Sequence, residues 1–139
     1  MRTLLTALCF SALAGLASAQ ETSGTGIAIE LNTLAQAEGG CQLTFVASSS
    51  HPEGVAGVVF ETVLFDTEGS VDRLTLFDFG AIPAGVPRVR QFVVPALECT
   101  RLGRILINGV DSCSVPGLPD TACATGLTVR SRTGVEVIG

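Results

Sequence analysis

The chain contains no lysine, no tryptophan and no tyrosine, and it has a single histidine, His51. A protein kinase needs a strand lysine, and an antibody domain carries a buried tryptophan, so neither class fits. The formal net charge is −5, and removing the +1 of Arg2 with the leader described below gives −6 for residues 20–139. Such an acidic chain lacks the basic face that phosphates require, so we expect no nucleic-acid partner.

The first 19 residues have the pattern of a signal peptide. Arg2 precedes an uncharged apolar run at residues 4–16, and Ala-Ser-Ala follows as the small-x-small pattern of a cleavage site. We therefore predict export by the Sec route, cleavage after Ala19 and a single domain at residues 20–139. No stretch of this domain reaches membrane-spanning length without a charge, glycine or proline, so no transmembrane segment is expected. The expected location is the periplasm, with secretion as the alternative.

Long amphipathic helical patterns are also missing after the leader. Instead, short runs with β-type alternation are separated by Gly, Pro, Ser or Asp. In one of them Cys41, Leu43 and Phe45 fall on one face, with Gln42 and Thr44 on the other. The seven runs are residues 26–34, 41–47, 57–66, 71–79, 86–94, 104–110 and 127–132. They predict an all-β fold, a seven-stranded antiparallel β-sandwich of the immunoglobulin (Ig) or fibronectin type III class.

Four of the five cysteines lie after the leader, which contains Cys9. An even number in an exported chain predicts a disulfide framework, for which three pairings exist. No C-x-x-C pair is present, which argues against a zinc or redox site. Because successive strands of the predicted sandwich alternate in direction, Cys41 and Cys99 fall at one end and Cys113 and Cys123 at the other. This topology favours the pairs Cys41–Cys99 and Cys113–Cys123.

Several short motifs in the middle of the chain resemble a known group of proteins. They are Phe65-Asp66-x-x-Gly69-x-Val71, Ile82-Pro83-Ala84-Gly85 and Phe92, within a wider set of Cys41, Leu97-x-Cys99, residues 103–108 and Cys113. Together they resemble the Ig-like, FxLyD-related domains of small exported envelope proteins of proteobacteria, over roughly residues 30–132. The resemblance implies the fold. Since the motifs are turn and core residues, it implies no active-site residue.

Three fragments look like parts of catalytic or metal sites. Asp78-Phe79-Gly80 matches the magnesium-binding tripeptide of kinases, but without the other kinase motifs it predicts the end of a strand. His51 follows three serines, yet neighbouring loop positions do not align a hydroxyl with an imidazole, so we expect a solvated loop. Residues 66–72 carry three carboxylates, and we expect a solvated hairpin turn there, with a calcium site as the alternative. We predict no catalytic residue, no metal site and no cofactor.

Two features suggest binding instead. Arg88 and Arg90 share one face of the fifth run, and Arg130 and Arg132 share one face of the last. If these strands were neighbours, the four arginines would form a patch for an anion; otherwise they form a polar face that discourages edge pairing.

The second feature is the segment between Cys113 and Cys123, which contains two prolines. A disulfide there would hold Val115 and Leu118 on a small rigid protrusion, which lowers the entropy lost on binding. The alternative is an ordinary stapled loop.

Taken together, these features predict a non-enzymatic module of the bacterial cell envelope that acts by protein–protein interaction. Its expected partner is another envelope protein. The alternative is a periplasmic accessory protein that binds an anionic small molecule or glycan through its arginines. A hydrolase is the weakest hypothesis, since no set of triad or metal residues can be assembled from the sequence.

Overall fold

The computed structural model describes residues 24–139, so the predicted signal peptide and its cleavage site after Ala19 lie outside the described residues. Eight strands and two short 3₁₀ helices form within residues 24–139. In chain order they are β1 (Ile27–Ala37), β2 (Gly40–Ser49), β3 (Gly57–Asp66), β4 (Val71–Asp78), β5 (Arg88–Pro95), η1 (Cys99–Arg101), β6 (Leu102–Ser114), η2 (Asp120–Cys123), β7 (Thr128–Ser131) and β8 (Glu136–Ile138). In this part of the chain no helix has the length and apolar character needed to cross a membrane.

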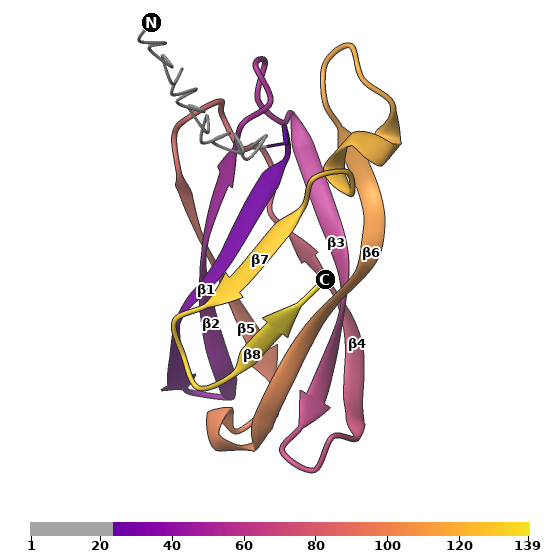
Figure 1. Ribbon diagram of the computed structural model, residues 1–139. Helices are drawn as coiled ribbons and strands as arrows, with labels where there is room; N and C mark the ends of the chain where they lie inside the picture. Colours follow the sequence, from indigo (N-terminus) through magenta and orange to yellow (C-terminus); the bar gives the residue numbers. More distant parts are fainter. Residues whose placement is uncertain (1–23) are drawn as a thin grey trace, which may run out of the picture.

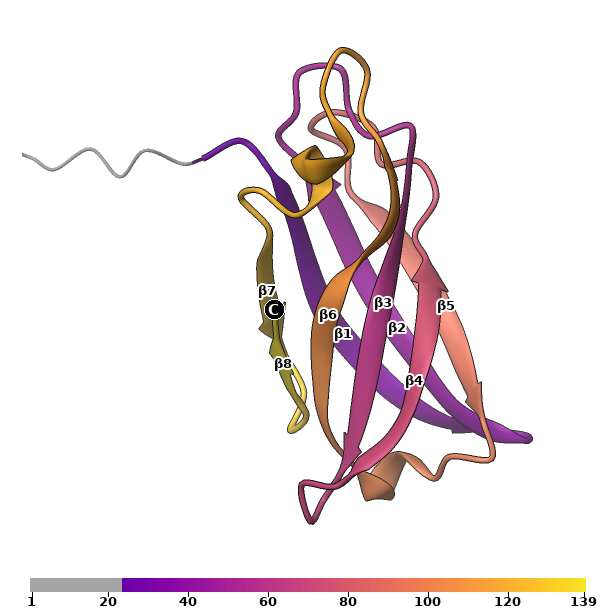
Figure 2. The same cartoon turned by 90° about the vertical axis from the view of Figure 1, so that its right-hand side faces the viewer.

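The strands form two layers, each a four-stranded sheet (Figures 1 and 2). The first sheet has the order β5-β2-β1-β7, and the second has the order β4-β3-β6-β8. Figure 2 shows β7 and β8 together at one side of the two layers, and β4 and β5 at the other. The chain is therefore all-β, as the alternating runs predicted.

The prediction of seven antiparallel strands needs two corrections. The described chain has an eighth strand, β8, and both sheets are mixed, because β7 runs parallel to β1 and β8 runs parallel to β6. The direction follows from the end at which the chain enters each sheet. Thr128 begins β7 beside Ala28, near the start of β1, and Glu136 begins β8 beside Arg104, near the start of β6.

The core lies between the sheets and follows from the two-residue period of the strands. In β2, for example, Cys41, Leu43 and Phe45 are fully buried, while the residues between them are partly exposed. Five phenylalanines meet across the layers. Their rings form tilted, edge-on and stacked pairs with centroids 4.5–6.0 Å apart, and they are Phe45, Phe60, Phe77, Phe79 and Phe92. Aromatic pairs in these arrangements add about 0.5–1.5 kcal/mol each beyond the burial of their area.

The edge strands β4 and β5 belong to different sheets and are joined by side chains between the layers. Phe77 of β4 stacks on Phe92 of β5, with ring centroids 4.5 Å apart. On one side of this pair, Arg73 donates from Nη1 to the carbonyl oxygen of Pro95. On the other side, Arg90 donates to the carbonyl oxygens of Phe79 at 2.7 Å and Ala81 at 2.9 Å. We call these residues the β4–β5 clasp.

Two disulfides tie the sandwich at its opposite ends. Cys41 is joined to Cys99, 58 positions apart, and Cys113 is joined to Cys123, 10 positions apart. These are the two pairs that the alternating strand direction favoured. The first connects the start of β2 to η1, and the second connects the end of β6 to η2.

We expect the two disulfides to contribute unequally to stability. In the loop-entropy description, the longer closed loop contributes about 4 kcal/mol and the shorter one about 3 kcal/mol. The double variant Cys41→Ala/Cys99→Ala should therefore lower the free energy of unfolding more than Cys113→Ala/Cys123→Ala. Urea unfolding of both variants beside the wild type measures the difference. A larger loss from the second variant would contradict the expectation.

Candidate functional site

The Asp-Phe-Gly tripeptide ends a strand, as predicted. β4 ends at Asp78, whose Oδ1 accepts the backbone N–H of Gly80 at 2.8 Å. Phe79 is fully buried in the aromatic cluster, and Gly80 takes a positive φ of 62°. The carboxylate therefore shapes a turn, and the phenylalanine fills the core.

The carboxylates at residues 66–72 also belong to a turn. Asp66 Oδ1 accepts the backbone N–H groups of Glu68 and Ser70, both at 2.9 Å, and Gly69 adopts φ 86°. Asp72 lies beyond the turn and pairs with Arg73. Within residues 24–139 no group of three or more His, Cys, Asp or Glu side chains could hold a metal ion. The arrangement is that of the predicted hairpin.

The four arginines do not form the anion patch that the sequence suggested. β5, which carries Arg88 and Arg90, and β7, which carries Arg130, are the opposite edges of the first sheet, with β2 and β1 between them. Arg90 also belongs to the β4–β5 clasp, where its donors bind backbone carbonyls. Arg130 and Arg132 are exposed near the other edge. The condition for the patch, neighbouring strands, is not met.

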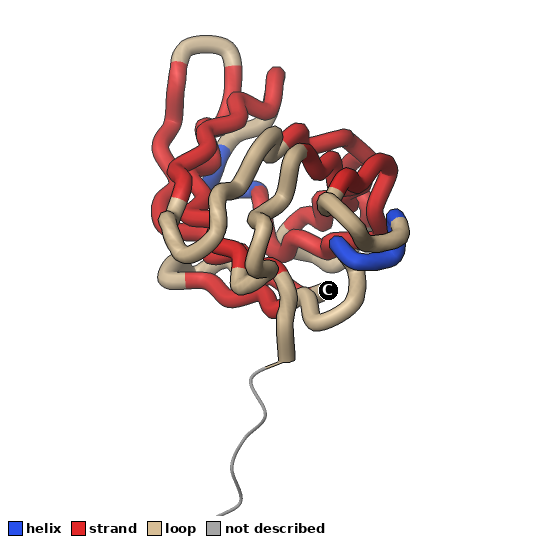
Figure 3. Tube along the Cα trace, turned by 90° about the horizontal axis from the view of Figure 1, so that it is seen from above, coloured by secondary structure: helices blue, strands red, loops and turns tan. Residues whose placement is uncertain are grey.

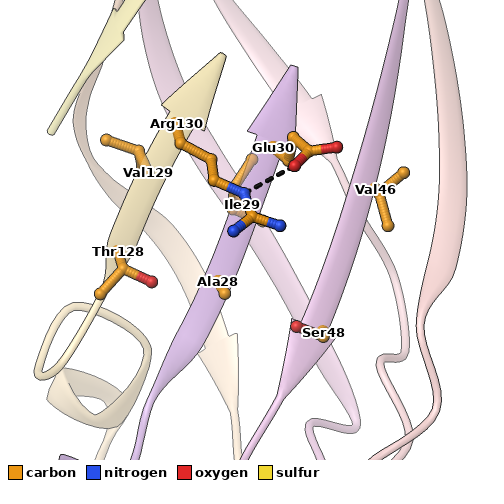
Figure 4. A pocket seen from close by; sticks show the side chains of 8 residues that line it. All are labelled: Ala28, Ile29, Glu30, Val46, Ser48, Thr128, Val129 and Arg130. Carbon is orange, nitrogen blue, oxygen red and sulfur yellow. Dashed lines mark hydrogen bonds and ion pairs between the residues drawn. The ribbon is translucent and has the colours of Figure 1, made fainter. Parts of the chain in front are cut away.

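Arg130 instead pairs with Glu30, a residue that the sequence did not single out. Figure 4 shows its guanidinium group lying across β1 toward the Glu30 carboxylate, with 2.6 Å between Nε and Oε2. The pair crosses a shallow hollow of about 370 Å³ on the outer face of the first sheet. Glu30 Oε1 accepts a second bond, from Asn32 Nδ2 at 3.1 Å. The Asn32 bond, and after it the positive charge of Arg130, hold the pKa of Glu30 below its ordinary value.

The segment closed by Cys113–Cys123 contains a turn whose residues suit it. Val115-Pro116-Gly117-Leu118 forms a turn in which the N–H of Leu118 bonds to the carbonyl of Val115 at 3.1 Å. Proline suits the second position of such a turn, and Gly117 at φ 76° suits the third. The 3₁₀ helix η2 follows directly and ends at Cys123. Figure 3 looks onto this end of the sandwich.

The two apolar residues that we expected to be exposed on the protrusion differ in their exposure. Val115 is only 5% exposed and packs against the core, so its predicted display to a partner is wrong. Leu118 is 49% exposed. Val115 directly follows β6 and belongs to the core cluster, whereas Leu118 lies beyond the turn, two residues before η2. One anchor remains of the two predicted.

Leu118 borders a hollow of about 430 Å³. We call it the loop-end hollow, and its lining comes from the start of the described chain, the β2–β3 loop and the segment from Leu118 onward. The lining residues are Thr25, His51, Pro52, Leu118, Pro119, Thr121, Ala122 and Thr125. The structure thus brings together Leu118 and His51, which are 67 positions apart and were considered separately in the sequence.

His51 is buried, which corrects the prediction of a solvated loop. The residue is 3% exposed, and neither Nδ1 nor Nε2 has a hydrogen-bond partner among the described residues. The nearby serines are occupied by backbone: Ser49 Oγ accepts the backbone N–H of His51 at 3.1 Å, and Ser50 Oγ bonds to Gly26. The imidazole is therefore not aligned with either hydroxyl.

The lowered pKa of Glu30 predicts a specific pH dependence. The charged carboxylate adds stability above the pKa of the unfolded chain, about 4.3, and this contribution is lost as the pH falls through the lower folded value. We expect Asn32→Ala and Arg130→Ala each to raise the pKa of Glu30, and Glu30→Gln to remove this part of the acid destabilisation. NMR titration of the carboxyl carbon and urea unfolding at several pH values measure the two effects. An unchanged pKa in both variants would contradict the assignment.

The imidazole of His51 has no hydrogen-bond partner in the described part of the chain, so we predict a gain of stability on its removal. A buried polar group without a partner is unfavourable, and an apolar side chain of similar size avoids this. We expect His51→Leu to raise the free energy of unfolding by about 1 kcal/mol. His51→Gln keeps a polar group at the site and serves as the control that gives no gain. Destabilisation by His51→Leu would contradict the expectation.

Comparison of the chain with protein-family models, with curated proteins and with solved structures gave no match.

Proposed function

We propose that the protein is an exported, non-enzymatic, Ig-like module of the bacterial cell envelope that acts by binding another protein. Two facing four-stranded sheets and two disulfides support a domain of this kind, since disulfides persist in oxidising compartments. The sequence pattern of residues 1–19 supports export to the periplasm. The contact is made at the loop end.

The observation that carries this proposal is the exposure of Leu118 on a braced loop. Its side chain is half exposed beside the loop-end hollow, while the Cys113–Cys123 disulfide and the Pro116-Gly117 turn hold the backbone that carries it. An apolar anchor on an already ordered loop loses little entropy when it is buried by a partner. The hollow beside it accepts an apolar side chain from that partner, as the centres of protein interfaces commonly do.

Binding of an anion through the arginines has less support. Arg90 is bonded within the β4–β5 clasp, and Arg130 is paired with Glu30. Each guanidinium group therefore already has an internal acceptor, and the arginine-bearing strands occupy opposite edges of one sheet.

The test uses the exported protein as bait in envelope extract, followed by binding measurements with the purified partner. We expect Leu118→Asp to weaken the partner's affinity by about tenfold or more, since it places a charge at the centre of an apolar contact. Val89→Asp is the matched control, because Val89 is 58% exposed on β5 of the first sheet. It should leave the affinity unchanged.

Both variants change a surface side chain, so their melting temperatures should stay close to that of the wild type. A partner that binds Leu118→Asp as tightly as the wild type would refute the loop-end contact. Equal losses in the two variants would show that the contact is not local to this loop.

A further inference from the structure

A row of apolar residues crosses the outer face of the second sheet. Leu74 of β4 lies opposite Val63 of β3, and Val63 lies opposite Leu106 of β6. Leu106 in turn lies opposite Ile138 of β8. Ile105, the neighbour of Leu106 in β6, is fully buried, so alternation turns this row away from the core. Side chains directly opposite each other on one face of a sheet are in contact, so the four residues form one surface, which we call the apolar row.

Most of the apolar row is open to solvent within residues 24–139. Leu74 is 57% exposed, and Leu76, on the same face of β4, is 52% exposed. Leu106 and Ile138 are partly exposed, and only the central Val63 is buried. Contiguous apolar surface of this kind marks a site of contact with another protein.

The outer face of the first sheet has no comparable row. The row there runs from Val89 of β5 through Val46 of β2 to Glu30 of β1 and Arg130 of β7. Half of its residues are charged, and these two are paired with each other. The two outer faces of the sandwich therefore differ in character.

Residues of opposite charge flank the apolar row along the two central strands. On one side, Arg104 of β6 lies opposite Phe65 of β3 and pairs with Glu136 of β8, with 2.7 Å between Nε and Oε2. On the other side, Glu61 of β3 accepts a hydrogen bond at Oε1 from Asn108 Nδ2. Arg104 binds Glu136 through Nε alone, so its two terminal nitrogens remain to donate, and Glu61 Oε2 remains to accept, within the described chain.

We propose that this face binds the same face of a second copy of the chain, in a weak symmetric dimer. The two-fold axis lies between the copies and runs along the apolar row, so that the two rows pack on each other. Rotation about this axis exchanges the two sides of the row, which brings the Arg104 side of one copy over the Glu61 side of the other. The two residues are then offset by one strand, about 5 Å, which an arginine side chain spans. The face is therefore complementary in charge to itself, and the contact between Arg104 and Glu61 is made twice.

The size of the face fits a dimer of low affinity. The longest paired strand on it, β3, has ten residues. Four strands about 4.8 Å apart, with a rise of about 3.3 Å per residue, give a face of roughly 500 Å² per copy. A total of about 1,000 Å² is the lower bound for a specific interface, where contacts are weak and reversible. At such a contact the charges select the partner and its orientation more than they add affinity.

Sedimentation velocity of the exported protein, with both disulfides intact, tests the proposal at concentrations up to about 1 mM. We expect a reversible equilibrium between monomer and dimer. Leu74→Glu should weaken dimerisation by about tenfold or more, because it places a charge in the apolar contact. The matched control is Val89→Glu, a residue that is 58% exposed on the outer face of the other sheet, and it should leave dimerisation unchanged. Melting temperatures of both variants should stay close to that of the wild type.

Charge reversal tests the orientation of the two copies. Arg104→Glu places a carboxylate against Glu61 of the other copy, and Glu61→Arg places a cation against Arg104, so each variant alone should dimerise more weakly than the wild type. Mixed in equal amounts, the two variants should associate with each other, because both contacts then join an arginine to a glutamate. This rescue distinguishes the proposed pairing from a general loss of stability.

The proposal is overturned if the exported protein stays monomeric at about 1 mM, which would leave the face to a different protein. It is also overturned if Leu74→Glu sediments as the wild type does, if Val89→Glu weakens dimerisation as much as Leu74→Glu, or if the mixed charge variants associate no better than each alone. Because this surface does not include Leu118, Leu118→Asp should dimerise as the wild type does. The outcome is therefore independent of the loop-end test.

Discussion

The stacked pair of Phe77 and Phe92 is the contact on which the arrangement of the two sheets depends. β4 and β5 are edge strands of different sheets, and no backbone ladder joins them. The rings stack at 4.5 Å, and Phe45 and Phe79 pack around the pair. The arginines of the clasp then satisfy backbone carbonyls at both ends of the stack. The stacked rings and the arginine hydrogen bonds around them close this side of the sandwich. Arg73 and Arg90 therefore have a structural role.

The inward direction of Phe77 also decides what β4 shows to solvent. Because strand residues alternate, an inward Phe77 requires an outward Leu76, and the same rule places Leu74 outward. β4 is thus apolar on both faces, although only one face has a partner within the described chain. β5 carries the other ring of the stack, and it sends Arg90 toward the backbone after β4 just as β4 sends Arg73 toward Pro95. Both edge strands of the contact therefore carry an inward-pointing charge, of the kind that protects an edge from further pairing.

The sequence predicted what depends on local periodicity and strand direction. Alternation around Cys41, Leu43 and Phe45 located β2, and the direction of successive strands selected both disulfide pairs. What it missed depends on contacts between distant segments. β8 has three residues, too few for a periodic signal, and the parallel direction of β7 is set by where the disulfide-closed loop returns the chain. The separation of the arginines likewise follows from strand order.

The burial of His51 at the loop end was also missed, because it depends on contacts between segments far apart in the sequence. Ser-Ser-Ser-His-Pro-Glu-Gly has the composition of an exposed loop, yet it shares a hollow with Leu118, Pro119 and Ala122. The ring is buried, and it has no hydrogen-bond partner within residues 24–139. Buried polar side chains usually have hydrogen bonds, and the exceptions need an explanation. An apolar residue would fill the same space with less penalty, so stability alone does not account for His51. Sequences depart from the rules of stable packing mainly at functional sites. The departure at His51 lies at the hollow that Leu118 borders, so it falls at the same end of the sandwich as the proposed contact.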